Sequence, residues 1–324
     1  MSSPPVIFLM GPTASGKTDL AIGLTEHLPL DLISVDSALV YRGMDIGSAK
    51  PDAETLDKYP HSLVDIRDPS EPYSAADFCR DAEKCIAESH NQGRIPLLVG
   101  GTMLYFKALR DGLADMPPTD FEMREKIEAR AAKDGWPQLH AELRAIDPVS
   151  AERIHPNHSA RIERALQVFH STGIPMSEYH ADQGRNDFCD RYDLRQVAIL
   201  PQDRKVLHDR IERRLGAMFK EGFLEEVEAL FARGDLSPEL PSIRAVGYRQ
   251  VWSYLEAELS LEEAQQRAFF ATRKLAKRQL TWMRSWSELK LLYTQDSHGV
   301  TLPVNTLVEG CLKILNLEQY KNRI

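Results

Sequence analysis

A phosphate-loop motif near the start of the chain limits its possible folds more than any other segment does. The segment GPTASGKT at 11–18 follows an apolar run, VIFLM at 6–10, and precedes an amphipathic stretch, DLAIGLTEHL at 19–28. A strand, a glycine-rich turn and a helix in this order can cradle phosphate groups, because N–H groups of the turn and of the helix N-terminus converge on an anion. A plain turn between a strand and a helix is the alternative. The predicted phosphate-binding residues are Gly11, Pro12, Thr13, Ala14, Ser15, Gly16, Lys17 and Thr18.

Short apolar runs alternate with helical stretches along most of the chain. The runs are VIFLM at 6–10, DLISVD at 31–36, HSLVDI at 61–66, IPLLVG at 95–100, RQVAIL at 195–200 and KLLYT at 290–294. Such alternation is typical of a parallel sheet covered by helices on both faces. The sequence therefore predicts an α/β fold with a P-loop-type parallel sheet.

The alternation breaks between the fourth and fifth runs, where no strand pattern stands out. We therefore expect an inserted all-helical domain over residues 114–194, with the α/β core formed by residues 1–113 and 195–324. The polar stretch ADQGRNDFCDRYD at 181–193 is the expected return linker.

Helix boundaries in the insert are predicted from capping residues. Thr119 with Glu122 predicts a capping box, and Gly135 predicts the end of that helix. Asn157 is the expected cap of a second helix that ends near Thr172 and Gly173.

Two helices are predicted after the return to the core. Asp203 is the expected cap of a helix running to about Glu221, and Ser260 with Glu263 predicts a capping box that opens a long helix ending near Trp286. Between Ala264 and Arg284 that helix has basic but no acidic residues. The basic residues are Arg267, Arg273, Lys274, Lys277, Arg278 and Arg284.

Composition restricts the class of protein. The chain has 324 residues and a net charge of −8, which argues mildly against a nucleic-acid partner unless charge is concentrated locally. No apolar run approaches the roughly 20 residues needed to cross a bilayer, and the N-terminus does not resemble a secretory signal. The 4 cysteines are scattered, without metal-ligand spacing. We expect a cytoplasmic protein with no membrane partner.

A few side chains outside the loop are candidates for chemistry. Asp36 ends the second apolar run, where open α/β sheets bind ligands, and a carboxylate there can hold magnesium through water, take a proton, or only cap the next turn. Gly100, Gly101 and Thr102 end the fourth run. Arg210 and Arg214 lie one helical turn apart and form either a solvated helix face or a clamp for phosphate, since phosphate transfer and diphosphate departure both need positive charge.

The histidines of IHPNHSARIER at 154–164 do not predict a metal site. His155 and His158 have no accompanying third ligand. The arginines beside them, Arg153, Arg161 and Arg164, suggest phosphate contacts instead.

Several of these segments together resemble one family, the tRNA dimethylallyltransferases, which place an isopentenyl group on the adenine 3′-adjacent to the anticodon. The matching segments, which cover most of the chain in family order, are GPTASGKT, ISVDSALVYRGMDIGSAKP, LLVGGTMLY, RIHPNHSARIERALQVF and IRAVGYRQVW. The run from Asp36 to Gly47 is the most specific of them. The resemblance implies a P-loop core with a helical insertion that binds the anticodon stem-loop, and a monomer is expected.

The resemblance also implies roles for particular residues. The loop would bind the diphosphate of dimethylallyl diphosphate rather than ATP, with Thr18 as the magnesium ligand. Asp36 would be the general base, Thr102 would place the reacting amine, and Arg214 would steady the diphosphate. The segments that would contact tRNA comprise Asp36, Ser37, Ala38, Leu39, Arg124, Ala160, Arg161, Ile162, Glu163, Arg164, Arg244, Ala245, Val246, Gly247, Tyr248 and Arg249.

Two departures from the family pattern affect base preference more than the reaction. Many members have Met-Gln where this chain has Ala38 and Leu39, and a glutamine where it has Ala160. Polar contacts to anticodon-loop bases would then be fewer.

Three other classes of function remain open at the level of sequence. A small-molecule kinase or NTPase would use the same loop for ATP, although the fourth run ends in glycines rather than in an acidic metal ligand. A prenyltransferase acting on free adenine nucleotides is the second. The third is a non-catalytic RNA-binding module, which leaves the loop, Asp36 and the arginines unexplained.

Overall fold

The computed structural model describes residues 3–181 and 186–317, and the chain divides into two compact units. The α/β unit comprises Met1–Ala108 and Phe188–Ile324, and the helical unit comprises Leu109–Asp187. The helical unit thus begins and ends somewhat earlier than the expected segment, 114–194. Each unit is described separately.

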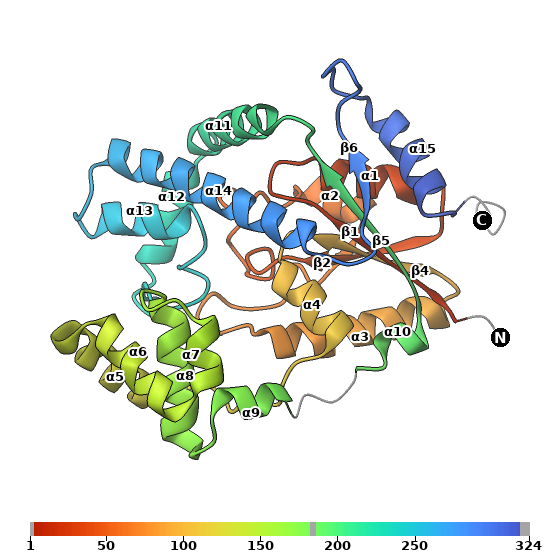
Figure 1. Ribbon diagram of the computed structural model, residues 1–324. Helices are drawn as coiled ribbons and strands as arrows, with labels where there is room; N and C mark the ends of the chain where they lie inside the picture. Colours follow the sequence, from red (N-terminus) through yellow and green to blue (C-terminus); the bar gives the residue numbers. More distant parts are fainter. Residues whose placement is uncertain (1–2, 182–185, 318–324) are drawn as a thin grey trace. The chain divides into compact units, whose positions relative to one another are not determined.

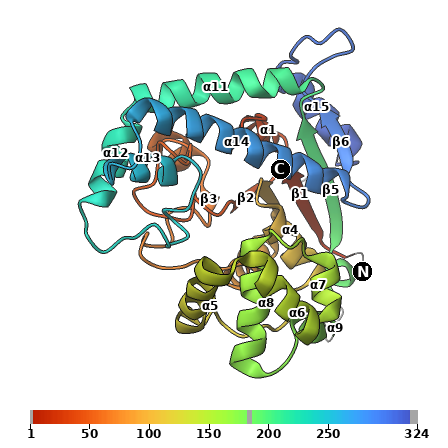
Figure 2. The same cartoon turned by 60° about the vertical axis from the view of Figure 1, so that its left-hand side comes forward.

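The α/β unit is built on one six-stranded sheet with the order β3-β2-β4-β1-β5-β6 (Figures 1 and 2). The strands are β1 Pro5–Met10, β2 Leu30–Val35, β3 His61–Ser62, β4 Ile95–Gly100, β5 Asp193–Leu200 and β6 Lys290–Tyr293. All five neighbouring pairs are parallel. This confirms the predicted α/β class and places β1, which leads into the phosphate loop, inside the sheet.

Helices cover both faces of the sheet. The helices of the α/β unit are α1 Lys17–Thr25, α2 Ala53–Lys58, α3 Ala75–Asn91, α4 Met103–Asp111, α10 Phe188–Arg191, α11 Arg204–Lys220, α12 Phe223–Phe231, α13 Tyr248–Leu255, α14 Leu261–Arg284 and α15 Val304–Ile314, of which α4 ends in the helical unit. None of the helices in the described part of the chain is long and apolar enough to cross a membrane.

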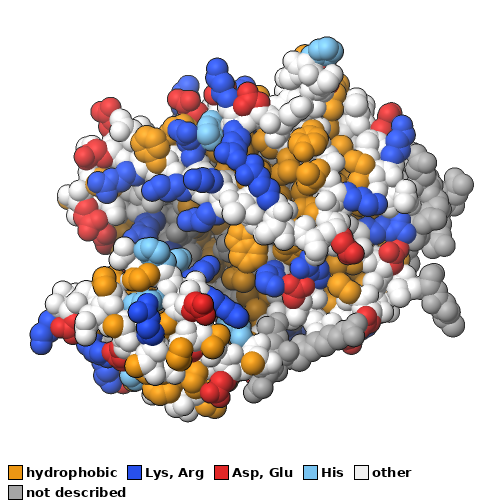
Figure 3. All heavy atoms as spheres, viewed as in Figure 1, with side chains coloured by type: hydrophobic (Ala, Val, Ile, Leu, Met, Phe, Trp, Pro, Cys, Tyr) orange, Lys and Arg blue, Asp and Glu red, His pale blue; other side chains and the backbone are white. Residues whose placement is uncertain are grey.

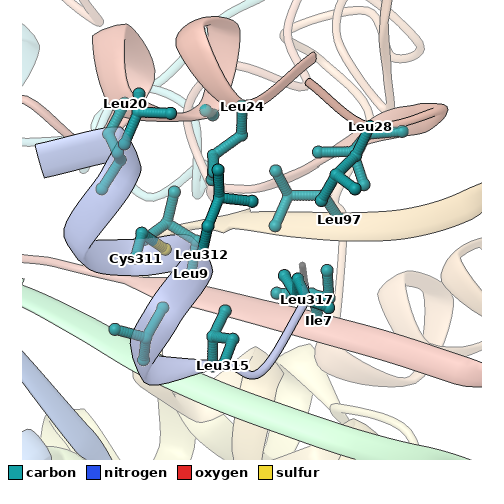
Figure 4. Packing of buried hydrophobic residues seen from close by; sticks show 14 of the residues in the cluster. Ile7, Leu9, Leu20, Leu24, Leu28, Leu97, Cys311, Leu312, Leu315 and Leu317 are labelled. Carbon is teal, nitrogen blue, oxygen red and sulfur yellow. The ribbon is translucent and has the colours of Figure 1, made fainter. Parts of the chain in front are cut away.

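The hydrophobic core follows the alternation of side chains along β1. Ile7 and Leu9 pack with Leu24 of α1 and Leu312 of α15 (Figure 4). Phe8 points to the opposite face, where its ring centroid lies 4.9 Å from that of Phe106 on α4. Because both faces of β1 are buried, the strand has a continuous apolar run, as expected of a central parallel strand.

The third predicted strand is much shorter than its apolar run. We expected a strand over 61–66, but β3 ends at Ser62. Leu63 and Asp65 have φ values of 65° and 54°, in the left-handed region that breaks an extended strand. The extended prediction for 63–66 was therefore wrong.

Both predicted caps after the insert are confirmed. The Asp203 side chain accepts a hydrogen bond from Lys205 N, and α11 ends at Lys220. Ser260 and Glu263 form the reciprocal capping box of α14, which ends at Arg284, two residues before the predicted end.

The helical unit contains α5 Phe121–Asp134, α6 Trp136–Ile146, α7 Pro148–Arg153, α8 Ser159–Thr172 and α9 Met176–Ala181. Its own core includes Ile127, Leu139, Leu143, Ile162 and Leu166. A separate core agrees with an independently packed unit.

Two of the predicted caps in the helical unit are wrong, and two helix ends are confirmed. Asp120, not Thr119, caps α5, because its carboxylate reaches Met123 N at 3.0 Å. The residue before α8 is His158 rather than Asn157, and it makes no side-chain capping bond. Both predicted helix ends are confirmed. Gly135 follows the last residue of α5, and Gly173, which has a left-handed conformation, follows the last residue of α8.

The expected return linker, 181–193, is only partly described. Residues 182–185 lie outside the described residues. Phe188–Arg191 form α10 instead of an irregular linker, because Phe188 is fully buried, with its ring centroid 5.9 Å from that of Phe8.

Candidate functional site

The phosphate loop has a backbone shape that depends on its glycines. Gly16, with φ at 88°, is the residue before α1, and a Cβ on Gly11 would lie 2.6 Å from Ser15 Oγ. Ala14 has φ at 61°, an uncommon conformation for a residue with a Cβ, and one that concentrates at ligand sites. Gly16 offers no side chain to cap α1, so the helix presents its first N–H groups to an external acceptor.

Two side chains far away in the sequence hold this loop. Gln279 of α14 accepts a hydrogen bond from Thr13 N at 2.9 Å and donates one to Gly101 O at 2.9 Å. Arg210 of α11 donates to Ser15 O at 3.4 Å. Sequence reasoning missed Gln279, since no local pattern distinguishes it from other polar residues of α14.

Three charged groups interact at the centre of the α/β unit. Burial lowers the pKa of the Lys17 ammonium to about 8, although nearby Asp36 opposes the shift and Arg214 adds to it. Burial also lowers the pKa of Arg214, against the attraction of Asp36 and Asp19. The structure therefore brings Lys17, Asp36 and Arg214 close enough to interact electrostatically.

Asp36 is held by the turn that follows β2. Its Oδ1 accepts hydrogen bonds from Ala38 N at 2.9 Å and from Leu39 N at 3.4 Å. Thr102 lies beside this turn, where its Oγ1 accepts from Ser37 N at 3.2 Å and its own N–H donates to Val35 O. Asp36 thus both caps a turn, the alternative role considered from sequence, and lines the cavities described next.

Two cavities of the α/β unit open onto these residues. The P-loop cavity, about 640 Å³, is lined by residues that include Ser15, Lys17, Thr18, Ser34 and Arg210. The central cavity, about 470 Å³, is lined by residues that include Thr102, Leu215, Met218, Arg278 and Trp282. Both are lined by Thr13, Ala14, Asp36, Ser48, Ala49 and Arg214. Asp36 and Arg214 therefore lie where the two cavities adjoin.

The predicted tRNA-contact segments of the α/β unit lie mostly around the central cavity. Ser37 and Ala38 line it, as do the residues from Arg244 to Tyr248. Leu39 lines the P-loop cavity, and Arg249 is exposed. Tyr248 is fully buried and donates its hydroxyl to Glu226 at 2.6 Å.

Glu226 of α12 also binds the turn that contains Gly47. Its carboxylate accepts hydrogen bonds from the N–H groups of Asp45, Ile46 and Gly47 at 2.8, 2.7 and 3.1 Å. The phenyl ring of Phe223 lies 2.0 Å from where a Cβ on Gly47 would be. Glu226 thereby links the turn before Ser48 and Ala49 to Tyr248.

The remaining predicted contact residues lie in the helical unit. Ala160 and Arg161 are exposed in the first turn of α8, whereas Ile162 is fully buried in the core of this unit. Arg164 donates to Gln167 Oε1 and Pro117 O, both at 2.6 Å. Arg124 of α5 lies 3.0 Å from Glu128 and 3.7 Å from Glu163.

The basic residues of α14 divide between two surfaces. Arg278 lines the central cavity. The others line a third cavity with α11, which we call the basic groove; its residues include Arg204, His208, Arg267, Arg273, Lys274, Lys277 and Arg284. Figure 3 shows basic side chains gathered over this part of the molecule. No carboxylate is among the described residues that line the groove.

Comparison with known families places most of the chain in one of them. Residues 39–286 match the family model described as IPP transferase. The chain is 54% identical to tRNA dimethylallyltransferase 2 of Hahella chejuensis, over 97% of this chain and 95% of that protein.

Solved structures of similar proteins have the same fold. The tRNA isopentenylpyrophosphate transferase of Bacillus halodurans is 36% identical, with a TM-score of 0.68 over 98% of each chain. The corresponding enzyme of Staphylococcus epidermidis is 30% identical, with a TM-score of 0.68 over 97% of this chain and 99% of that one. A eukaryotic dimethylallyltransferase acting on tRNA, 24% identical with a TM-score of 0.76 over 97% of this chain and 80% of that one, shares the fold.

Proposed function

This chain belongs to the IPP transferase family and is a tRNA dimethylallyltransferase, and we propose that it joins its two substrates at Asp36, where the P-loop cavity adjoins the central cavity. The donor is dimethylallyl diphosphate, and the acceptor is the N6 amine of the adenine 3′-adjacent to the anticodon. The observation that carries this proposal is the set of residues common to both cavities, which includes Asp36 and Arg214.

The P-loop cavity suits the diphosphate. As the bond from the allylic carbon to oxygen breaks, the electron pair leaves with the diphosphate, whose negative charge grows. The N-terminus of α1, Lys17 and Arg214 lie where they can stabilise that charge, and Arg210 supports the loop through Ser15 O. The eight residues from Gly11 to Thr18 are the proposed diphosphate site.

The donor set of this cavity fits magnesium. Mg²⁺ prefers oxygen ligands and usually binds through one or two protein groups together with substrate phosphates and water. Thr18 and Asp36, which both carry side-chain oxygens, line the cavity, and the described residues contain no cluster of three His, Cys, Asp or Glu side chains that would suggest another metal. Thr18 is the proposed ligand, and the ion would neutralise charge on the diphosphate.

The central cavity suits the acceptor base. Leu215, Met218 and Trp282 supply apolar walls against which a flat ring and an allylic group can pack. The adenine N6 forms a bond to the allylic carbon while its proton passes to the Asp36 carboxylate. Thr102 places the amine, because its hydroxyl is fixed beside the Asp36 turn.

Entry of the adenine requires the base to leave its stack. Proteins that extrude a base offset a cost of about a few kcal/mol with contacts to the rest of the nucleic acid. The proposed contacts in the α/β unit are the segments from Asp36 to Leu39 and from Arg244 to Arg249, together with the basic residues of α14. The proposed contacts of the helical unit are Arg124 and the segment from Ala160 to Arg164, through its exposed residues Ala160 and Arg161.

We also propose that the enzyme is a cytoplasmic monomer with the tRNA anticodon stem-loop as its nucleic-acid partner. Light scattering of the purified chain alone would measure its oligomeric state. The same measurement with an anticodon stem-loop would give the number of RNA molecules bound per enzyme.

The reaction is tested by incubating purified protein with unmodified tRNA, dimethylallyl diphosphate and Mg²⁺, followed by mass analysis of the digested nucleosides. We expect adenosine in which a dimethylallyl group replaces one N6 hydrogen, and none when the 3′-adjacent adenine is replaced by guanine. A parallel reaction with free AMP in place of tRNA tests the alternative acceptor. A dimethylallylated product would form there only if the enzyme were a prenyltransferase of free adenine nucleotides. Phosphoryl transfer from ATP to a small acceptor, without nucleoside modification, would refute the proposal.

A further inference from the structure

Buried polar atoms without a protein partner gather in one place. Among the described residues, four buried side-chain atoms have no hydrogen-bond partner: Ser15 Oγ, Ser34 Oγ, His61 Nε2 and Gln295 Nε2. The first three belong to residues that line the P-loop cavity. A buried polar group without a hydrogen-bond partner is destabilising, so three in a single cavity indicate a site built for a ligand.

Ser34 and His61 are brought together by the sheet. β2 pairs with β3 in the register Leu32 to His61, so Ser34 lies two residues further along β2 on the face that carries Leu32. Leu32 belongs to the core cluster beneath α1, and Ser34 therefore faces the side of the sheet on which the phosphate loop continues into α1. Ser34 is only 3% exposed.

The chemistry of His61 selects the kind of ligand. Its Nδ1 lies 2.7 Å from Tyr59 O, and only a protonated Nδ1 can donate to a carbonyl. In the neutral ring, which burial favours by lowering the pKa of His61, Nε2 is then a hydrogen-bond acceptor. The oxygens of an ionised phosphate are also acceptors, so they cannot bond Nε2 directly. Nε2 therefore requires a hydrogen-bond donor, such as a metal-bound water.

We propose that Ser34 Oγ and His61 Nε2 accept hydrogen bonds from water ligands of the Mg²⁺ that Thr18 and the diphosphate hold in the P-loop cavity. This inference rests on the proposed diphosphate site and adds two positioning residues to it. Mg²⁺ loses its water ligands reluctantly, so a site with few protein ligands needs acceptors for those waters. Both residues lie outside the phosphate-loop motif and have no sequence signature of metal binding.

The test is thermal unfolding of the full chain with inorganic pyrophosphate while Mg²⁺ is titrated. Ser34→Ala should raise the Mg²⁺ concentration for half-maximal stabilisation about tenfold, as is typical when a residue that orients a metal's ligands is lost. The same substitution should leave the melting temperature of the ligand-free enzyme unchanged or higher, because it removes a buried hydroxyl that has no protein partner. His61→Phe should weaken the Mg²⁺ response similarly, and His61→Gln, which keeps an acceptor, should restore most of it.

Ser242→Ala is the matched control. Ser242 is also fully buried, but its hydroxyl donates to Pro69 O at 2.6 Å. This variant should melt at a lower temperature, with the Mg²⁺ midpoint of the wild type.

The outcomes separate this inference from the proposed function. A wild type that pyrophosphate with Mg²⁺ does not stabilise would refute the diphosphate site and this inference together. A wild type that responds, with a Ser34→Ala variant of the same Mg²⁺ midpoint, would refute the inference alone. So would a lower melting temperature of ligand-free Ser34→Ala, since the hydroxyl would then have a structural partner.

Discussion

At the scale of single residues, the proposed chemistry depends on one carboxylate that interacts with two cations. Asp36 lies close enough to Lys17 and Arg214 to affect both of their pKa values. A general base must accept a proton from the reacting group, and Asp36 is the only carboxylate that lines both cavities among the described residues. Its Oδ1 is occupied by the N–H groups of Ala38 and Leu39.

Asp36→Asn tests the base with minimal structural change. The amide oxygen can still accept from Ala38 N, but the side chain can no longer take a proton. We expect turnover to fall by about 10²- to 10⁴-fold, the usual contribution of general base catalysis, with RNA affinity nearly unchanged. Single-turnover kinetics and a binding titration with the anticodon stem-loop measure the two quantities. Near-normal turnover would remove the base role from Asp36.

Lys17 predicts a pH dependence of diphosphate binding. Since its pKa is lowered to about 8 in the free protein, the ammonium loses its proton as pH rises through that value. A bound diphosphate favours the charged form, so the complex retains a proton that the free protein loses. Affinity for pyrophosphate should therefore fall above pH 8, by up to about tenfold per pH unit.

The control for this prediction is Lys17→Arg, whose side chain stays charged over the range. The affinity of both proteins for pyrophosphate is measured by calorimetry at several pH values. Because pyrophosphate itself titrates equally in both experiments, the difference between the two pH profiles reports on Lys17. Identical pH profiles would show that Lys17 does not lose its proton in the free protein.

The lowered pKa of Lys17 also determines how its contribution to folding stability changes with pH. A buried lysine with a lowered pKa binds fewer protons in the folded than in the unfolded state between about pH 8 and its ordinary value. Its unfavourable contribution is therefore complete below pH 8 and is relieved as pH rises through that window.

At the scale of elements, α12 fixes a turn beside the two cavities through one side chain. Glu226 accepts from three consecutive backbone N–H groups, Asp45 to Gly47, and from the Tyr248 hydroxyl. This arrangement connects the turn beside the P-loop cavity with the segment at the central cavity. Burial, together with Glu226, raises the pKa of Tyr248, which keeps its hydroxyl a donor.

Glu226→Ala should release this turn. Hydrogen bonds to a charged group contribute about 1.5–3 kcal/mol each, so we expect a loss of about 3 kcal/mol or more in the free energy of unfolding, with faster hydrogen exchange at residues 45–47. Tyr248→Phe, the control, removes one bond and should cost about 1 kcal/mol. Unchanged exchange at residues 45–47 in Glu226→Ala would contradict this account.

The basic groove predicts a salt-dependent contribution to RNA binding. Neutralising Lys274 and Lys277 to glutamine should lower affinity for tRNA and reduce the salt slope by about 0.7–0.9 for each lost phosphate contact. Pyrophosphate affinity should not change. The matched control is Lys84→Gln with Lys313→Gln, exposed positions on α3 and α15. Equal salt slopes for the two double variants would exclude the groove from the interface.

At the scale of the whole molecule, two cores stabilise two units. The core cluster of the helical unit contains residues of that unit alone, and that beneath α1 and α15 contains residues of the α/β unit alone. Each unit is thus stabilised by its own hydrophobic core, and we expect the two units to unfold separately.

Leu143→Ala tests this independence. Leu143 is fully buried in the helical unit, and its truncation should cost about 2–5 kcal/mol. Hydrogen exchange should accelerate across α5, α6 and α8, whereas the stabilisation of the α/β unit by pyrophosphate persists. Leu24→Ala in the core under α1 should show the opposite pattern. Equal acceleration in both units would mean that the chain unfolds as one cooperative unit.

The features that could be predicted from the residues alone were local. The phosphate loop, the apolar runs of β1, β2, β4 and β5, and the caps at Asp203 and Ser260 were predictable, because each depends on residues within a few positions of one another. The premature end of β3 and the burial of Phe188 were missed, because left-handed turns and long-range packing override local propensity.

The assembly of the site depends on contacts that only the folded chain makes. Gln279 bonds Thr13 across 266 positions of sequence, and Ser34 and His61 line one cavity only because β2 pairs with β3. Sequence spacing does not encode such contacts, because they depend on the order of strands in the sheet and on the helix packed over it. The residue types at the site were therefore predictable, whereas their partners and the site's unpaired buried atoms were not.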